Sequence, residues 1–475
     1  MNAPIARLFG VVILLFALLA VFTTRWTVFE ASSLNNNTLN VRTLLDELHI
    51  KRGRILAADG TVLAKSVPAP GHTWSRAYPT RDLFSQAVGY SIAAQGRAQG
   101  LELSDGSDLR GVQTGLSSIF GQLSPRPVGD DVYTTLDPKG QRAAEQALAG
   151  QHGSVVAIDP RTGAVKVMYS NPSYDNNNPP TKATDNNTTF NRATQGAYAP
   201  GSTFKIVTAV AAIDSGMYTP DSVINGNSPR LVSGVPLAND GGKSWGPQTL
   251  TTAMVQSINT IFAQVAEHVG RPKMTEYMKR FGFYSKPPLD YPSFELNTSK
   301  PVGPNGHPYP PASPNEDIGR IGIGEGGLQV TPLQMAMVAA AVANGGKLMT
   351  PHLTDRVVDQ DGRTVKTTDP SVYSQVMKPT TAAEVTKMME KVVEEGTGTA
   401  VQLAGISIAG KTGTPEIGAQ GSNLTQPAFV AFAPADHPKI AIAVNVDISN
   451  GGFGGSVAAP IARQVLQALL SGSGG

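Results

Sequence analysis

The segment 204–215 is apolar on nearly every face of the helix that its residues favour. A helix without a polar face is buried on all sides, so the chain needs a domain large enough to surround one. Ser202 and Lys205 stand at its start, and Ser202 is the one serine in the chain with a lysine three positions later. If the helix begins at Gly201 or Ser202, the two side chains lie one turn apart on one face. The lysine amine could then activate the hydroxyl, which is a weak nucleophile by itself.

Composition excludes several kinds of chemistry. The 475 residues include no cysteine, which excludes thiol catalysis and disulfides. None of the seven histidines has the spacing of a metal site, so we expect neither a metal nor a cofactor. Lys and Arg number 38 and Asp and Glu 36, without a basic stripe, so no nucleic-acid partner is expected.

An uncharged apolar run, 8–24, follows Arg7. As a helix it spans about 25 Å, slightly short of the roughly 30 Å hydrocarbon core of a bilayer, and flanking side chains can make up the difference. A cleaved signal peptide is the alternative, but no clear A-x-A site directly follows the run. We expect an uncleaved single-pass anchor in the cell membrane, with residues 27–475 on the extracytoplasmic side.

Turn and strand signals indicate a mixed fold beyond the anchor. Asp59-Gly60 predicts a hairpin turn between two short apolar runs, and a helix is expected from about 138 to 150. Further strands are expected at 132–136, on both sides of a turn at 160–163, at 428–433 and at 440–446. A last helix is expected at 458–470. Strands at the edges of a helical middle predict a mixed α/β (α+β) domain from about 150 onward.

A second motif is Lys411-Thr-Gly413, which follows the strand-like run 406–410. On a strand, Lys411 and Gly413 point the same way. The missing side chain at Gly413 would let a substrate backbone lie against the strand edge, and the hydroxyls of Thr412 and Thr414 would help hold a carboxylate near the lysine. Neither motif is specific alone, because a chain of this length contains about one S-x-x-K by chance.

A third motif, S-x-N, occurs three times, beginning at Ser33, Ser257 and Ser313. Ser33 follows the anchor, and Ser313 lies in a proline-rich loop. Ser257 and Asn259 instead stand where two helical patterns meet, so we favour this pair. Its hydroxyl could relay a proton, and its amide could hold a substrate carbonyl.

S-x-x-K, S-x-N and K-T-G in this order resemble the motifs of penicillin-binding proteins and serine β-lactamases. The chain is most similar to class B penicillin-binding proteins, and its compact N-terminal region to their actinobacterial penicillin-binding protein A type. The similar stretches include 52–64, 191–205, 322–335, 344–346 and 396–399. The resemblance covers about 52–465 and implies an antiparallel sheet flanked by helices and an all-helical subdomain. An elongated mixed N-terminal domain and one transmembrane helix would precede them.

The resemblance also implies a domain division and a set of partners. A cytoplasmic tail and anchor would occupy 1–26, a pedestal or dimerisation-like domain 27–150, and the transpeptidase domain 151–475. The implied partners are peptidoglycan stem peptides, β-lactam antibiotics, the cell membrane and other membrane proteins of the division or elongation machinery.

The implied activity is that of a monofunctional peptidoglycan D,D-transpeptidase. Ser202 would attack the penultimate D-Ala carbonyl of a stem peptide ending in D-Ala-D-Ala, and the amine of a neighbouring stem would take up the acyl group. Lys205 would be the base, which requires a pKa well below the ordinary value of about 10.4. The charge of Lys411 is the expected cause, while the same lysine binds the terminal carboxylate of the substrate.

The remaining motif residues receive supporting roles from the resemblance. Ser257 would pass the proton toward the leaving amine, and Asn259 would orient the stem peptide. Thr412, Gly413 and Thr414 would bind substrate. The backbone N–H groups of Ser202 and Thr414 would form the oxyanion hole.

Four alternatives accompany this interpretation. A β-lactamase would need a deacylating glutamate, and the partial E-L-N echo at 295–297 has Ser293 in that position. A D,D-carboxypeptidase would differ only in using water as acceptor, which the sequence does not settle. The non-enzymatic alternative is a membrane β-lactam sensor, which would usually carry a larger cytoplasmic portion, or a scaffold that retains the fold but not turnover. A bifunctional glycosyltransferase would need more than the roughly 120 residues between anchor and transpeptidase domain.

Overall fold

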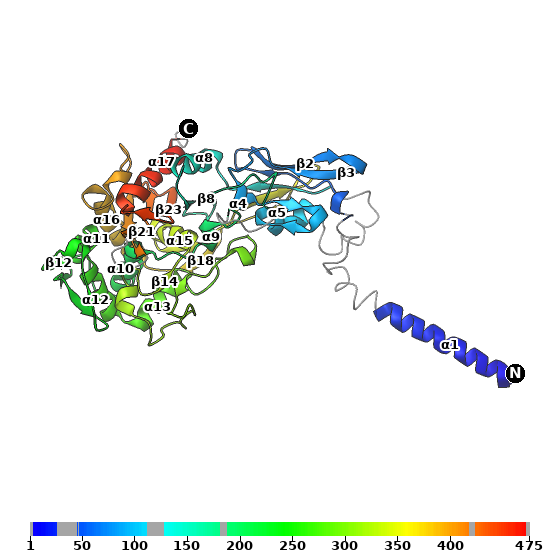
Figure 1. The fold of residues 1–475 in the computed structure, drawn as a ribbon, viewed down its shortest axis with the longest axis horizontal. Coiled ribbons are helices and arrows are strands. Elements are labelled where there is room, and N and C mark those ends of the chain that lie inside the picture. The colour runs from blue at the N-terminus through cyan, green and yellow to red at the C-terminus, as the bar shows by residue number, and fades with distance from the viewer. Residues whose placement is uncertain are drawn as a thin grey trace.

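The computed structural model describes residues 3–25, 45, 47–111, 128–180, 188–417 and 423–471. Two sheets organise most of them, one with five strands in the order β19-β22-β23-β7-β8 and one with six in the order β17-β16-β6-β1-β2-β3. Figure 1 shows the six-stranded sheet on the side of the molecule nearer to helix α1 (Ala3–Thr24), with most of the helices around the five-stranded sheet.

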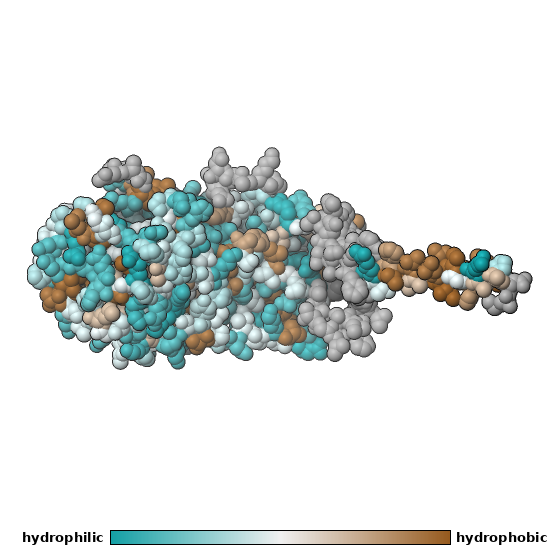
Figure 2. All heavy atoms as spheres, turned by 90° about the horizontal axis from the view of Figure 1, so that it is seen from below, coloured by the Kyte–Doolittle hydropathy of each residue, from teal (hydrophilic) through white to brown (hydrophobic). Residues whose placement is uncertain are grey.

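Helix α1 stands apart from the folded body (Figure 1), and none of its residues is buried. Figure 2 shows apolar residues along its length, whereas polar and apolar residues mix on the surface of the body. The helix begins at Ala3, five residues before the expected start at Leu8, because Arg7 is accommodated within it. Its 22 residues span about 33 Å, so the helix is long and apolar enough for one membrane span without help from flanking side chains.

The five-stranded sheet is antiparallel throughout. Its strands are β7 (Gly153–Ile158), β8 (Val165–Asn171), β19 (Ala409–Gly413), β22 (Ala428–Ala433) and β23 (Ile440–Val446). Every residue of β7, β22 and β23 is buried, since helices cover both faces. The strands expected in these places are confirmed, and β19 forms an open edge of the sheet.

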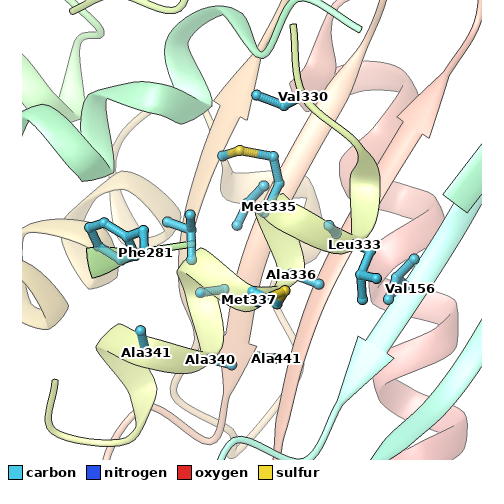
Figure 3. Packing of buried hydrophobic residues seen from close by; sticks show 14 of the residues in the cluster. Val156, Phe281, Val330, Leu333, Met335, Ala336, Met337, Ala340, Ala341 and Ala441 are labelled. Atoms are coloured by element: carbon cyan, nitrogen blue, oxygen red, sulfur yellow. The ribbon is translucent and has the colours of Figure 1, made fainter. Parts of the chain in front are cut away.

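Helices α8 (Pro138–Ala147) and α17 (Ala459–Leu470) cover one face of this sheet, as their shared core with β22 and β23 shows. Helix α15 (Pro332–Ala343) covers the other face. In Figure 3, Leu333 and Ala336 of α15 lie next to Val156 of β7. The sheet therefore lies between two helical layers. This confirms the antiparallel sheet flanked by helices that the family resemblance implied.

Helix α10 (Lys205–Asp214) confirms the expected fully buried helix, because all ten of its residues are buried. It contacts α12 (Asn259–Val269), α13 (Arg271–Arg280) and α16 (Pro379–Glu394). These helices form the helical part of the molecule, and α10 runs through the middle of it.

The six-stranded sheet combines distant parts of the chain. Its strands are β1 (Ile55–Leu56), β2 (Val62–Ala69), β3 (Thr73–Ala77), β6 (Asp131–Thr134), β16 (Thr354–Val358) and β17 (Thr364–Thr367). Gly60, with φ 85°, forms the expected turn between β1 and β2. The hairpin of β16 and β17 pairs with β6, so residues 354–367 extend the sheet of the N-terminal region.

Shorter elements connect these layers. The short helices are α4 (Ser85–Val88), α5 (Gly100–Ser104), α6 (Gly106–Leu109), α9 (Arg192–Gln195), α11 (Leu250–Val255) and α14 (Ile318–Ile321). The short strands are β4 (Ser91–Ile92), β5 (Arg97–Ala98), β9 (Val223–Asn225), β10 (Arg230–Val232), β11 (Val235–Leu237), β12 (Pro247–Thr249), β13 (Lys300–Pro301), β14 (Leu328–Gln329), β15 (Lys347–Met349), β18 (Val372–Gln375), β20 (Glu416–Ile417), β21 (Leu424–Thr425) and β24 (Ser449–Asn450).

Candidate active site

One cleft of about 1190 Å³ brings the three motifs together. Ser202 lies on its wall, together with Ser257, Asn259, Thr412 and Thr414. These residues come from the turn before α10, the start of α12 with the turn before it, and the end of the edge strand β19. The amines of Lys205 and Lys411 meet at the hydroxyl of one of these wall residues, Ser257.

The turn that carries Ser202 is a short 3₁₀ helix, Gly201–Phe204, that leads directly into α10. The N–H of Gly201 donates to the carbonyl of Gly324 at 3.1 Å. A Cβ atom on Gly324, where φ is +82°, would lie 1.9 Å from the Gly201 oxygen, so only glycine permits this approach. Because Ser202 is in the first turn, its N–H has no partner within the helix and can face a ligand.

Ser257 joins the two buried lysines. The Nζ of Lys205 donates to Ser257 O at 2.7 Å and to Ser257 Oγ at 3.2 Å, and the Nζ of Lys411 donates to the same Oγ at 3.0 Å. The backbone of Ser257 is left-handed, with φ +56°, which is uncommon for a residue other than glycine. Since its oxygen accepts from both lysines, its own hydrogen is free to point to a ligand.

Asn259 lies at the first position of α12 and faces Lys205. Its Oδ1 accepts from the Lys205 amine at 2.6 Å, and its Nδ2 donates to Ala238 O at 3.4 Å. Lys205 therefore has three oxygen acceptors, two of them from Ser257, and no carboxylate is among its hydrogen-bond partners in the described part of the chain. These uncharged oxygens can accept hydrogen bonds from both the charged and the neutral Lys205 amine. A base needs this because it passes between the two forms during the reaction.

Both lysines are completely buried. Burial lowers the pKa of Lys205 well below its ordinary value, and the charge of Lys411 lowers it further. Burial also lowers the pKa of Lys411 to about 7, against the opposing effect of Asp240. The expectation that Lys411 is the main cause at Lys205 was therefore incomplete, because desolvation is the larger effect and the second cation adds to it.

The position of Gly413 differs from expectation. A Cβ atom there would lie 2.7 Å from the carbonyl oxygen of Pro200 and 3.0 Å from Cγ2 of Thr203. The space beside Gly413 is thus occupied by the turn that carries Ser202, and it is not an opening for a substrate backbone. The glycine lets β19 and this turn approach each other closely.

The two threonines of the K-T-G segment already have hydroxyl partners. Thr412 shares a hydrogen bond of 2.6 Å with Thr397, and Thr414 Oγ1 accepts from the Gly454 N–H at 3.0 Å. Both residues still line the cleft. A carboxylate bound there would compete with these contacts or share them.

The two other S-x-N matches lie elsewhere. Ser313 does not line the cleft, and its Oγ accepts from the N–H of Asn315 within its own loop. Ser33 lies outside the described residues. Ser257 and Asn259 alone among the described matches reach the cleft.

Sequence reasoning missed several residues that line the cleft, among them Asp240, Glu325 and Phe453. A signal existed for Glu325, which is a single carboxylate among glycines at 322–327. Asp240 begins a short 3₁₀ helix, Asp240–Gly242, and Phe453 lies in a loop, and neither belongs to a motif. Among the described residues, no group of three or more His, Asp or Glu side chains could hold a metal ion.

Comparison with known families assigns the chain to one of them. Residues 153–467 match the penicillin binding protein transpeptidase domain, and residues 52–123 match the penicillin binding protein A dimerisation domain. The chain therefore belongs to the penicillin-binding protein transpeptidase family.

Within this family the chain is similar over its whole length to mycobacterial proteins. It is 34% identical over 504 residues to the peptidoglycan D,D-transpeptidase PbpA of Mycolicibacterium smegmatis, with 99% of each chain covered. PbpA of Mycobacterium tuberculosis H37Rv is also 34% identical, over 99% of this chain and 100% of its own length.

Solved structures agree with the sequence relatives. The ceftriaxone acyl-enzyme complex of penicillin-binding protein A from M. tuberculosis has a TM-score of 0.80 and 31% identity, covering 90% of this chain and all of its own. The D,D-transpeptidase domain of a peptidoglycan glycosyltransferase from Eggerthella lenta has a TM-score of 0.77 and 32% identity, covering 90% and 99%. The fold is thus that of penicillin-binding protein transpeptidases.

Proposed function

We propose that this chain is a peptidoglycan D,D-transpeptidase that forms an acyl-enzyme on Ser202, with stem peptides ending in D-Ala-D-Ala and with β-lactams. One observation carries the proposal: two buried lysine amines share the Ser257 hydroxyl in the cleft that Ser202 lines. The mycobacterial relatives are peptidoglycan D,D-transpeptidases, which supports the reaction, and a ceftriaxone acyl-enzyme complex of penicillin-binding protein A supports covalent β-lactam binding.

Acylation begins with a neutral Lys205 amine. At an ordinary pKa of about 10.4, about one lysine in 2,500 is neutral at pH 7, which corresponds to a cost of about 4.6 kcal/mol. The lowered pKa of Lys205 removes much of this cost. Lys205 takes the proton of Ser202 as its Oγ attacks the D-Ala carbonyl, and the N–H groups of Ser202 and Thr414 hold the oxyanion.

Release of D-Ala follows through the shared hydroxyl. Ser257 Oγ accepts from the Lys205 amine, so its own hydrogen can pass to the leaving nitrogen while Lys205 replaces it. Lys411 binds the terminal carboxylate of the stem, with the threonine hydroxyls beside it. Because an opposite charge raises the pKa of an amine, a bound carboxylate would convert Lys411, with its pKa of about 7, to the fully charged form.

We further propose that α1 is a single-pass membrane anchor with the catalytic domain on the extracytoplasmic side. Residues 1–26 would form the cytoplasmic tail and anchor, 27–150 the N-terminal pedestal domain and 151–475 the transpeptidase domain. The hairpin at 354–367 would then tie the transpeptidase domain to the N-terminal sheet. Other membrane proteins of division or elongation are the proposed partners of the N-terminal domain.

The β-lactamase alternative receives no support from the cleft. Neither Ser293 nor the segment 295–297 lines it. Glu295 is buried and accepts from the Gly100 N–H at 3.1 Å, at the start of α5. This carboxylate holds the N-terminal region and cannot activate water at Ser202.

A fluorescent penicillin tests the assignment of Ser202. We expect covalent labelling of the full chain in detergent, with the label mapped to Ser202 by mass spectrometry. Ser202→Ala should abolish labelling, and the exposed Ser293→Ala should label like the wild type. Labelling that survives Ser202→Ala would overturn the assignment. Incubation with a D-Ala-D-Ala stem and an acceptor amine then separates cross-linking from hydrolysis, since a carboxypeptidase would release only the shortened stem.

A further inference from the structure

Glu325 is a cleft residue to which the motifs assign no role. It directly follows Gly324, whose carbonyl accepts from the N–H of Gly201, the residue before Ser202. The Glu325 side chain lines the cleft and is 42% exposed, so a ligand can reach it. The hydrogen bond between Gly201 and Gly324 therefore places the Glu325 carboxylate beside the turn that carries Ser202.

The carboxylate of Glu325 lacks a hydrogen-bond donor within the part of the chain that the structure describes. Its one ion pair there is with Arg320, and the two charged atoms are 3.6 Å apart, beyond a hydrogen bond. Arg320 itself donates to Pro236 O at 3.1 Å and lies 3.5 Å from Asp317. Glu325 thus offers oxygen acceptors to the cleft.

The charges around Ser202 are not evenly placed. The charges of Glu325 and Asp240 both favour the charged form of Lys205, and Asp240 also favours the charged form of Lys411. A donor stem brings a negative terminus, which Lys411 attracts. An acceptor stem brings a positive ammonium group, which needs an anion near the acyl group on Ser202.

We propose that Glu325 binds the ammonium group of the acceptor stem beside the Ser202 acyl-enzyme. The inference rests on the proposed transpeptidase function and names the site for its second substrate. The chemical class of the ligand is a primary amine on a peptide side chain or chain end. An ammonium group donates charge-assisted hydrogen bonds to carboxylates, which the free acceptors of Glu325 can take.

The proposed step balances in protons and bonds. The bound ammonium group gives one proton to the Glu325 carboxylate, which is a better acceptor than an ordinary glutamate because partial burial raises its pKa. The neutral amine then attacks the acyl carbonyl, a C–N bond forms, and the ester bond to Ser202 Oγ breaks. The second amine proton passes to Ser202 Oγ by way of Lys205. The products are an amide and free Ser202, and the exposed Glu325 carboxyl releases its proton to solvent.

Partitioning of the acyl-enzyme tests the proposal. The full chain is acylated with a D-Ala-D-Ala stem peptide, and mass spectrometry follows transfer to glycinamide, a primary amine without a carboxylate, and to methanol, a neutral acceptor. In Glu325→Gln we expect transfer to glycinamide to fall about tenfold or more, because one charge-assisted hydrogen bond is lost. Transfer to methanol and penicillin labelling should not fall.

Two control variants separate this role from general electrostatics. Glu416→Gln removes a second carboxylate of the same cleft, and Arg320→Gln removes the ion pair of Glu325. Both should keep transfer to glycinamide. An equal loss in either control, an unchanged Glu325→Gln, or a parallel loss with methanol would overturn the role of Glu325. A wild-type chain that forms no acyl-enzyme would instead overturn the proposed function.

Discussion

Gly413→Ala is the substitution that most directly probes how β19 and the Ser202 turn fit together. The added Cβ would lie 2.7 Å from the Pro200 oxygen, whereas ordinary contacts begin at 3.4 Å, so the strand and turn must separate by about 0.7 Å. Overpacking of this kind costs about 1–3 kcal/mol in stability. Misplacement of catalytic groups by about 1 Å can cost about 10²-fold in rate. We therefore expect penicillin acylation to slow by about ten- to a hundredfold.

The assay combines the acylation rate with thermal unfolding of the same preparation. Fluorescent penicillin at several concentrations separates initial binding from the maximal acylation rate. Gly106→Ala is the matched control, because a Cβ atom at this helical glycine meets nothing within 4 Å. This control should keep the rate and the melting temperature, while Gly413→Ala lowers both.

Two outcomes would refute the reasoning about Gly413. If the maximal rate and the melting temperature are both unchanged, the close approach to Pro200 has no energetic consequence. If only binding of the donor stem weakens, the glycine is needed for the substrate backbone, as the sequence first indicated.

Two further predictions concern pH. Neutral Lys205 is the active form of the base, so the rate of acylation should rise with pH and level off well below the ordinary lysine pKa. Lys411→Met removes the nearby cation and thereby raises the pKa of Lys205. The rise in a pH profile of penicillin labelling should then move to higher pH. An unmoved profile would show that Lys411 does not influence the base. Burial raises the pKa of Asp105 from 3.8 to about 7, so the folded state holds a proton that the unfolded state releases between these values. Stability then falls with rising pH by at most about 1.4 kcal/mol per unit across that range, and Asp105→Asn should raise the melting temperature at pH 8 more than at pH 4. Equal shifts at both pH values would contradict this.

Local spacing accounts for what the sequence predicted correctly. Ser202 and Lys205 lie one helical turn apart in any helix, and Lys411 and Gly413 share a side of any strand. The apolar helix after Ser202 and the strands at 428–433 and 440–446 likewise follow from patterns within a few residues. The length of α1 was the exception, because a charged Arg7 near its start hid five helical residues.

Contacts between distant segments account for what the sequence could not show. Lys205 and Ser257 form a hydrogen bond although they are 52 positions apart in the chain. Ser257 and Lys411 form another across 154 positions. No local pattern indicates that Pro200 fills the space beside Gly413, or that 354–367 pairs with the N-terminal sheet. Glu325 lies beside the turn of Ser202, where the neighbouring Gly324 carbonyl accepts from the Gly201 N–H, 123 positions away in the chain.

The sequence by itself determined which groups could do chemistry, because residue type and short-range spacing fix a nucleophile, two amines and a hydroxyl. Only the tertiary structure decided how readily the two amines lose their protons. Burial within the packed domain removes water from Lys205 and Lys411, and this desolvation lowers both pKa values. Burial depends on every segment that closes over a site, and no single stretch of sequence contains it.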